Sequence, residues 1–500
     1  MTYDQIVQGL RDSRSELENE GRLVWAGLKT EQDTASIVER YAWLYSDEAL
    51  DAVGEPADEE GRRVRRALLA GIVERRTAAA QDRLNTHYAT AEAVVGDERV
   101  PFYTAQALLA SEPDPRQREA LEEGSEAVMA AAEELGLEVE ATVQEVIGGF
   151  GMGGYTEFWA ALKGIDYGRL RQELERLAGA TADRYRTWIE PRMDAVGSAF
   201  GECSRAHVAY FRSLPEHNAA HAAERFEPAM RRTFERLGLD LFSTPTIHID
   251  LEDRPAKNPR ACVCVPDAGR EVHLLVRPSG GANDYGAFMH EAGHALHFGL
   301  TEPGIGWPLA NVGSEAYAEL WSYLFERVGH DPAWLAEELG VSDAEAERIA
   351  ADQAGVDLML FTRYVGKLVN ELELYAGDPR DAARGRAIYA SRLSERTGFR
   401  YDPRVWQYDR DAGFYSADYL RAWLAEADLD RSLRRRFGER WWAVRDAGDW
   451  LREQWRRGWA PDAEDIVGET GGSPWSGDAL LERWSALLPP SRAAGVGGAR

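Results

Sequence analysis

The sequence predicts a mainly α-helical protein with one small β-sheet in its second half. From about residue 3 to residue 240, apolar side chains such as Ile6 and Leu10 recur at helical intervals. Around residue 244 the pattern changes to short apolar segments bounded by proline and glycine, which is typical of strands. Beyond these segments the helical pattern returns and continues to about residue 488.

Composition limits the possible partners. The 500-residue chain is 44% hydrophobic, so it can bury a large core, and its length allows two or more lobes. Its formal net charge of -27 argues against nucleic acids and anionic membranes as partners, because both attract basic surfaces. The N-terminus lacks a basic region followed by an apolar run, and no stretch has the roughly 18 apolar residues of a membrane span. We therefore expect a cytoplasmic protein.

Cysteine usage also favours a reducing compartment. The only cysteines are Cys203, Cys262 and Cys264, an odd number without CxxC spacing, so no disulfide framework is expected. Cys262 and Cys264 would point to the same side of a strand, where small buried hydrophobic side chains are the usual interpretation.

Three short strands are predicted at residues 246–250, 261–265 and 271–277. The free edge of such a sheet can pair with an extended peptide through main-chain hydrogen bonds, whatever the peptide's sequence. The alternative is a purely structural hairpin. We expect His248 and His273, which lie on these strands, not to bind a metal.

The next segment, residues 288–298, contains an HExxH motif. On a helix, His290 and His294 lie on one face about 6 Å apart along the axis, so both imidazoles can bind one metal ion. Two neutral imidazoles at this spacing suit zinc. Glu291 is then placed to take a proton from a water molecule whose pKa the cation lowers.

The residues around the motif support a buried helix. Asn283 and Asp284 offer an N-cap, and apolar residues such as Phe288 and Leu296 supply a buried face. His297 shares the helix but lies roughly 10 Å along the axis from His290, too far for both to bind one ion. We expect it to support the site rather than to bind the metal.

A third ligand is expected from residues 313–326, whose sequence pattern predicts a second helix with acidic side chains on one face. Glu315, Glu319 and Glu326 fall within about 40° of one another at 100° per residue. A catalytic zinc needs three protein ligands and one open position, so one of these acids should bind the metal. Another can orient an imidazole through a hydrogen bond.

Together the two segments resemble the thimet oligopeptidase and oligoendopeptidase F group of zinc metallopeptidases. The resemblance is strong from about residue 271 to 326, moderate from 400 to 426, and only architectural in the N-terminal half. It implies one zinc ion per chain with Glu319, at 319 - 294 = 25 residues beyond His294, as the third ligand, and Glu326 as a second acid seven residues later. Glu315 remains a rival, because angiotensin-converting-enzyme-like peptidases place an acid four residues beyond the ligand. The resemblance also implies two helical lobes around a deep substrate channel with the zinc at its floor.

A tyrosine-rich segment at residues 408–420 is similar to the one with which this family reaches its zinc site. The family often has a histidine shortly before these tyrosines, whereas the last histidine here is His330. Tyr408 and Tyr415, seven residues apart and hence on one helix face, match the family's tyrosine pair, and Tyr419 lies one turn further on. We expect these three tyrosines to stabilise the oxyanion of the reaction. The alternative is that they are packed aromatic residues.

The sequence thus predicts a helical N-terminal lobe at residues 1–240, a catalytic lobe at 241–488 and a disordered tail at 489–500. We expect a zinc metalloendopeptidase that cleaves short unstructured oligopeptides, with Glu291 as general base. A metallocarboxypeptidase or dipeptidyl carboxypeptidase of related fold is an alternative. A non-catalytic zinc-containing peptide-binding scaffold is another, but a structural zinc site needs no base, so Glu291 favours an enzyme. Neither a cleavage preference nor an oligomeric state is predicted.

Overall fold

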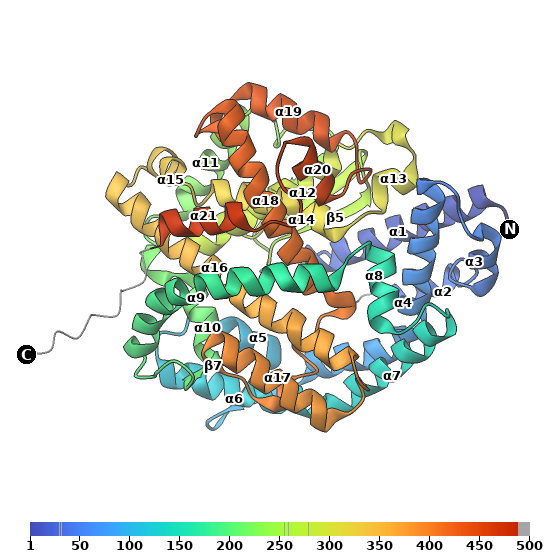
Figure 1. Ribbon diagram of the computed structural model, residues 1–500, viewed down its shortest axis with the longest axis horizontal. Helices are drawn as coiled ribbons and strands as arrows, with labels where there is room; N and C mark the ends of the chain where they lie inside the picture. Colours follow the sequence, from blue (N-terminus) through green and yellow to red (C-terminus); the bar gives the residue numbers. More distant parts are fainter. Residues whose placement is uncertain (30, 32, 255, 259, 279, 489–500) are drawn as a thin grey trace, which may run out of the picture. The chain divides into compact units, whose positions relative to one another are not determined.

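A computed structural model describes residues 1–488 except residues 30, 32, 255, 259 and 279 (Figure 1). The described chain is mainly helical with small sheets, as the sequence predicts. The predicted tail at 489–500 lies outside the described residues, and the substrate channel stays a prediction. None of the helices in this part of the chain has a stretch long and apolar enough to cross a lipid bilayer.

The chain forms two compact units, each assembled from three stretches. Unit 1 comprises Met1–Ala78, Glu216–Ala346 and Arg421–Pro474. Unit 2 comprises Ala79–Pro215, Glu347–Leu420 and the described residues after Pro474. Both units draw on residues from either side of position 240, so they do not coincide with the two lobes predicted from the sequence.

Unit 1 contains the three-stranded sheet and the helices around it. Its helices are α1 (Tyr3–Trp25), α2 (Thr34–Arg40), α3 (Asp47–Val53), α11 (Ala223–Arg236), α12 (Ala282–Gly299), α13 (Trp307–Asn311), α14 (Glu315–Val328), α15 (Pro332–Leu339), α19 (Arg445–Trp455) and α20 (Ala463–Glu469). Three further helices supply residues to both units: α4 (Glu59–Thr90), α16 (Asp343–Tyr375) and α18 (Tyr415–Phe437).

The sheet of unit 1 has the strand order β4 (Ile247–Asp250), β6 (Glu271–Leu275), β5 (Cys262–Asp267). The first pair is parallel and places His248 beside His273. The second pair is antiparallel and places Cys264 opposite His273. All three strands lie at the apolar segments, bounded by proline and glycine, that the sequence predicts as strands. Helix α12 packs against the sheet, and α1 packs along β5.

Helices α12 and α14 lie side by side in unit 1 (Figure 1), and a glycine permits their close approach. A Cβ atom on Gly293 would lie 2.3 Å from the carbonyl oxygen of Trp321 and 2.6 Å from the Cα of Ser322. Only a residue without a side chain fits there, because real Cβ atoms essentially never come within 3.0 Å of another heavy atom. Gly293 therefore sets the distance between the HExxH helix and the acid-bearing helix.

The start of α12 differs from the prediction. The helix begins at Ala282 after Gly281, whose φ is 93°, so Asn283 and Asp284 lie in the first turn and do not cap it. The amide of Ala282 instead donates to Oδ1 of Asn218 at 3.3 Å. The cap is thus supplied by a residue 64 positions earlier in the chain.

Unit 2 is helical apart from two short strand pairs. Strands β1 (Glu92–Val95) and β2 (Glu98–Pro101) form an antiparallel hairpin, and β3 (Cys203–Ser204) pairs in parallel with β7 (Phe399–Arg400). Its own helices are α5 (Phe102–Leu108), α6 (Pro115–Ala131), α7 (Glu133–Gly149), α8 (Tyr155–Lys163), α9 (Tyr167–Ala195), α10 (Val208–Ser213), α17 (Ala382–Thr397) and α21 (Asp478–Leu487).

Candidate metal centre

Three of the predicted residues converge within unit 1. Helix α12 presents His290 and His294, whose ring centroids are 5.1 Å apart, and α14 presents Glu319. Oε2 of Glu319 lies 3.3 Å from Nε2 of His290 and 3.6 Å from Nε2 of His294. Each residue offers one ligand atom, and these atoms all lie within 4.8 Å of one another.

These separations fit a tetrahedral zinc ion. With Zn–N and Zn–O bonds of about 2.0–2.2 Å, two ligand atoms of a tetrahedral site lie roughly 3.4 Å apart. The distances from Oε2 of Glu319 to the two Nε2 atoms, 3.3 and 3.6 Å, lie on either side of that value. The donor set, two imidazoles and one carboxylate, is also the set found in one class of catalytic zinc sites. The three residues therefore suit a zinc ion and leave a fourth position open.

The electrostatics of the site also favour a cation between these groups. Burial acts to raise the pKa of Glu319, but the imidazoles of His294 and His290 outweigh it and hold that pKa well below its usual range. Burial acts to lower the pKa of His290, but hydrogen bonds to Glu319 and Glu326 outweigh it and raise that pKa well above 6.5. Positive charge at the centre of the cluster is thus stabilised, and a metal ion can supply it in place of a proton.

Two further residues on α14 contact two of the three candidate ligands. Oε2 of Glu326 lies 2.8 Å from Nδ1 of His290, so this acid fixes the ring that presents Nε2 to the cluster. The hydroxyl of Ser322 is fully buried and lies 2.9 Å from Oε2 of Glu319, to which it can donate a hydrogen bond. Sequence reasoning identified Glu326 but missed Ser322, although its position three residues after Glu319 on a helix places it in reach.

Glu291 is half-buried beside the cluster. Within the described part of the chain its carboxylate makes no hydrogen bond and no ion pair. Glu315, the rival to Glu319, is exposed at the first residue of α14 and does not belong to the ligand cluster.

His297 is fully buried away from the ligand atoms. Its Nε2 lies 3.2 Å from the carbonyl oxygen of Gly458, and its ring packs on Tyr317 and Trp459 at 5.1 and 5.5 Å. Burial lowers its pKa to about 3, so the ring stays neutral at ordinary pH. His297 thus packs among aromatic side chains, and its role in support of the site stays a prediction.

The predicted tyrosines belong to unit 2. The expectation that Tyr408 and Tyr415 share one helix face is wrong, because Tyr408 lies in a turn and α18 begins only at Tyr415. The ring of Tyr408 packs on Tyr88 at 5.1 Å, and the rings of Tyr415 and Tyr419 pack edge to face at 4.8 Å. Their approach to the metal centre stays a prediction.

One amide on strand β5 already has a side-chain partner. The N–H of Val265 donates to Oε2 of Glu18, on α1, at 3.0 Å. A side-chain carboxylate thus already occupies one main-chain donor of β5, an edge strand of the sheet.

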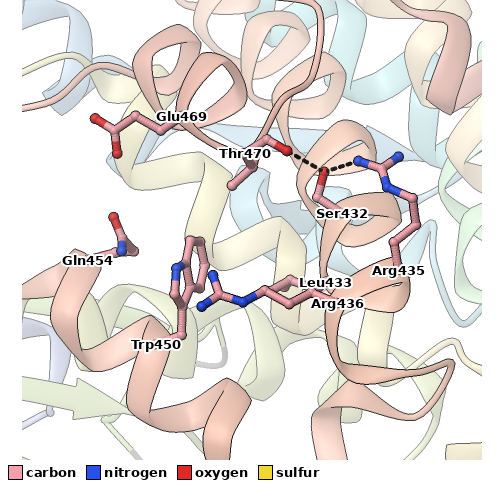
Figure 2. Close-up of a pocket in the computed structure, with 8 residues that line it drawn as sticks. All are labelled: Ser432, Leu433, Arg435, Arg436, Trp450, Gln454, Glu469 and Thr470. Atoms are coloured by element: carbon pink, nitrogen blue, oxygen red, sulfur yellow. Dashed lines mark hydrogen bonds between the residues drawn. The ribbon is translucent and has the colours of Figure 1, made fainter.

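Unit 1 also has a pocket of about 370 Å³ between the C-terminal end of α18 and helices α19 and α20 (Figure 2). Its lining residues are Ser432, Leu433, Arg435, Arg436, Trp450, Gln454, Glu469 and Thr470. None of them belongs to the ligand cluster, so this pocket takes no part in the metal centre.

Comparisons with known proteins identify the fold. No family model matches the chain, and no curated protein matches it in sequence. Its structure is similar to an M32 carboxypeptidase from Deinococcus radiodurans R1, with a TM-score of 0.61 and 15% identity over 97% of this chain and 99% of that one. A Pyrococcus furiosus carboxypeptidase gives a TM-score of 0.61 and 13% identity over 97% and 98%. A putative oligoendopeptidase F from Bacillus anthracis str. Ames has a TM-score of 0.58 and 12% sequence identity, over 95% of this chain and 83% of that one. The chain therefore shares its fold with proteins described as carboxypeptidases and oligoendopeptidases.

Proposed function

We propose that this chain is a zinc-dependent metallopeptidase that hydrolyses peptide bonds in short unstructured oligopeptides. The observation that carries the proposal is the convergence of His290, His294 and Glu319 at zinc-like separations, with Glu291 next to the first ligand. The fold shared with proteins described as peptidases supports it.

In this proposal each residue has a defined task. His290, His294 and Glu319 would hold a zinc ion, which when bound would act as a Lewis acid on the scissile carbonyl and lower the pKa of a water molecule. Glu291 takes the proton from the attacking water and passes it to the leaving amine. Tyr415, Tyr419 or Tyr408 donates a hydrogen bond to the carbonyl oxygen as negative charge develops on it.

The test of this proposal is the Glu291→Gln variant of the zinc-loaded protein. The amide cannot accept the proton, so we expect turnover of a mixed peptide library to fall roughly 100- to 10,000-fold. Zinc content should equal that of the parent because the ligands are unchanged. Peptide products are read by mass spectrometry and zinc by elemental analysis. Parental turnover in the variant would contradict the mechanism.

Carboxypeptidase action is a second candidate, which the extent of the shared fold favours. This chain covers 99% and 98% of the two carboxypeptidases but only 83% of the oligoendopeptidase F protein. Paired peptides with free and amidated C-termini separate the two activities. An endopeptidase cuts both at internal bonds, whereas a carboxypeptidase shortens only the free form from its end.

A further inference from the structure

Strand β5, which packs against α12, carries two cysteines side by side. Cys262 and Cys264 are two positions apart, so their side chains leave the strand on the same face. Their Sγ atoms are 4.0 Å apart. Cys264 is 8% exposed, whereas Cys262 is half-buried and more accessible. The third cysteine, Cys203, is buried in unit 2.

The distance between the two sulfur atoms suits a shared metal ion better than a disulfide. Two thiolates bound to one tetrahedral ion with Zn–S bonds of about 2.3 Å are roughly 3.8 Å apart. A disulfide requires about 2.05 Å. The observed 4.0 Å is thus close to the chelating separation without movement of the strand.

The surroundings of the pair are negative. A hydrogen bond with Cys264 and burial raise the pKa of the Cys262 thiol, and the carboxylates of Glu291 and Glu18 raise it further. Helices α12 and α1, which carry them, pack against β5. A cation bound by the sulfur atoms would offset this negative charge.

We propose that Cys262 and Cys264 form a second metal site, selective for a thiophilic divalent ion such as Zn²⁺ or Cd²⁺. On binding, each thiol loses one proton to solvent and forms one S–metal bond, so one ion replaces two protons. The remaining positions of the ion are filled by water, or by the carboxylate of Glu291 after a change of its side-chain rotamer. If Glu291 is the general base, as the proposed function has it, an ion that binds its carboxylate also blocks proton transfer and inhibits peptide hydrolysis.

The test titrates the reduced, full-length, zinc-loaded protein with Cd²⁺ and follows the thiolate-to-cadmium charge-transfer absorbance in the ultraviolet. We expect one equivalent of Cd²⁺ to produce this absorbance in the parent and in the matched control Cys203→Ser. Cys262→Ser and Cys264→Ser should lose it. Since Cys264 is buried, Cys264→Ala is measured as well, and circular dichroism checks that each variant is folded. Absence of the absorbance in the parent, or its persistence in the Cys262 variants, would overturn the site.

A second measurement tests the link to catalysis. Excess Cd²⁺ should inhibit the parent and Cys203→Ser, and the inhibitory concentration should rise at least tenfold in Cys262→Ala. Equal inhibition of all three proteins would refute the link to Glu291. The absorbance does not depend on peptide hydrolysis, so a protein that shows the thiolate band but cleaves no peptide would refute the proposed function and leave the thiol site standing.

Discussion

At the scale of single residues, the ligand cluster is held together by charge as much as by packing. Glu319 is 5% exposed, and a buried carboxylate without a compensating partner is costly. Its partners are the two imidazoles of the HExxH helix and the Ser322 hydroxyl. Loss of one member should therefore change both metal binding and local stability.

The two acids at the start of α14 give the sharpest comparison. Glu319→Ala removes a ligand, so we expect zinc affinity to fall by more than the roughly 100-fold that loss of an outer partner costs. Glu315→Ala, an exposed site one turn earlier on the same helix, should change it less than about tenfold. Competition with a chromogenic chelator measures both affinities. If Glu315→Ala empties the site and Glu319→Ala does not, our ligand assignment is wrong.

The tyrosines are tested by removing a hydroxyl while keeping the ring. Tyr415→Phe should reduce kcat about 100-fold with little change in KM or zinc content, as for a donor used mainly in the transition state. Steady-state kinetics on one defined peptide measures this. Parental kcat would exclude Tyr415, and the same substitution would then be made at Tyr419 and Tyr408.

The local parts of the site could be predicted from sequence because they depend on spacing along one helix. His290 and His294 converge through a four-residue repeat, and Glu326 reaches His290 from the neighbouring helix. The prediction that Tyr408 and Tyr415 share a helix face was wrong because it assumed that the helix of Tyr415 already includes Tyr408. Gly413 has a φ of 63° and Phe414 a φ of 56°, so the chain turns just before α18 begins. The N–H of Gly413 donates to the hydroxyl of Tyr155, 258 positions away, which no local pattern records.

At the scale of elements, the metal centre depends on how closely α12 and α14 approach. The ligands come from both helices, and the contact at Gly293 fixes their separation. The strands were predictable to within about two residues because proline and glycine bound them. The cap of α12 was not, because Asn218 comes from a distant segment.

Two glycines of α12 provide a matched pair. Gly293→Ala would force the helices apart, and we expect a loss of about 1–3 kcal/mol in the free energy of unfolding together with weaker zinc binding. Gly286 has only His330 Nε2 near its Cβ position, at 3.7 Å. Gly286→Ala should therefore be neutral or stabilising by up to about 1 kcal/mol. Chemical denaturation and chelator competition measure the two effects. Parental zinc affinity in Gly293→Ala would show that the helix spacing does not control the site.

At the scale of the whole molecule, the proposed function predicts a preference for extended substrates. The free edge of a sheet can bind only a chain that exposes its main-chain groups, which a folded protein does not. We expect short peptides to be cleaved and a folded protein to be spared. The control is the same protein unfolded by reduction and alkylation, which should be cleaved. Mass spectrometry of the products compares them, and equal digestion of the folded and unfolded forms would contradict the prediction.

The division into units was not predictable from sequence. Each unit depends on contacts between segments that lie hundreds of residues apart, whereas composition and period change only near residue 244. The sequence pattern therefore suggested a single boundary where the structure has interleaved stretches.

The interleaving of unit 1 has a consequence for its synthesis. Helices α12 and α14 are complete once the ribosome has passed Ala346, but Trp455 and Trp459, which cover Trp321 and Gly313, belong to the stretch that ends at Pro474. These endpoints are 474 - 346 = 128 residues apart. At about 5–20 residues per second, that interval lasts roughly 6–26 s. During this interval the apolar surface that Trp455 and Trp459 later cover is exposed to solvent, although α12 and α14 are already synthesised. We therefore expect chaperones to bind this protein while it is still being translated.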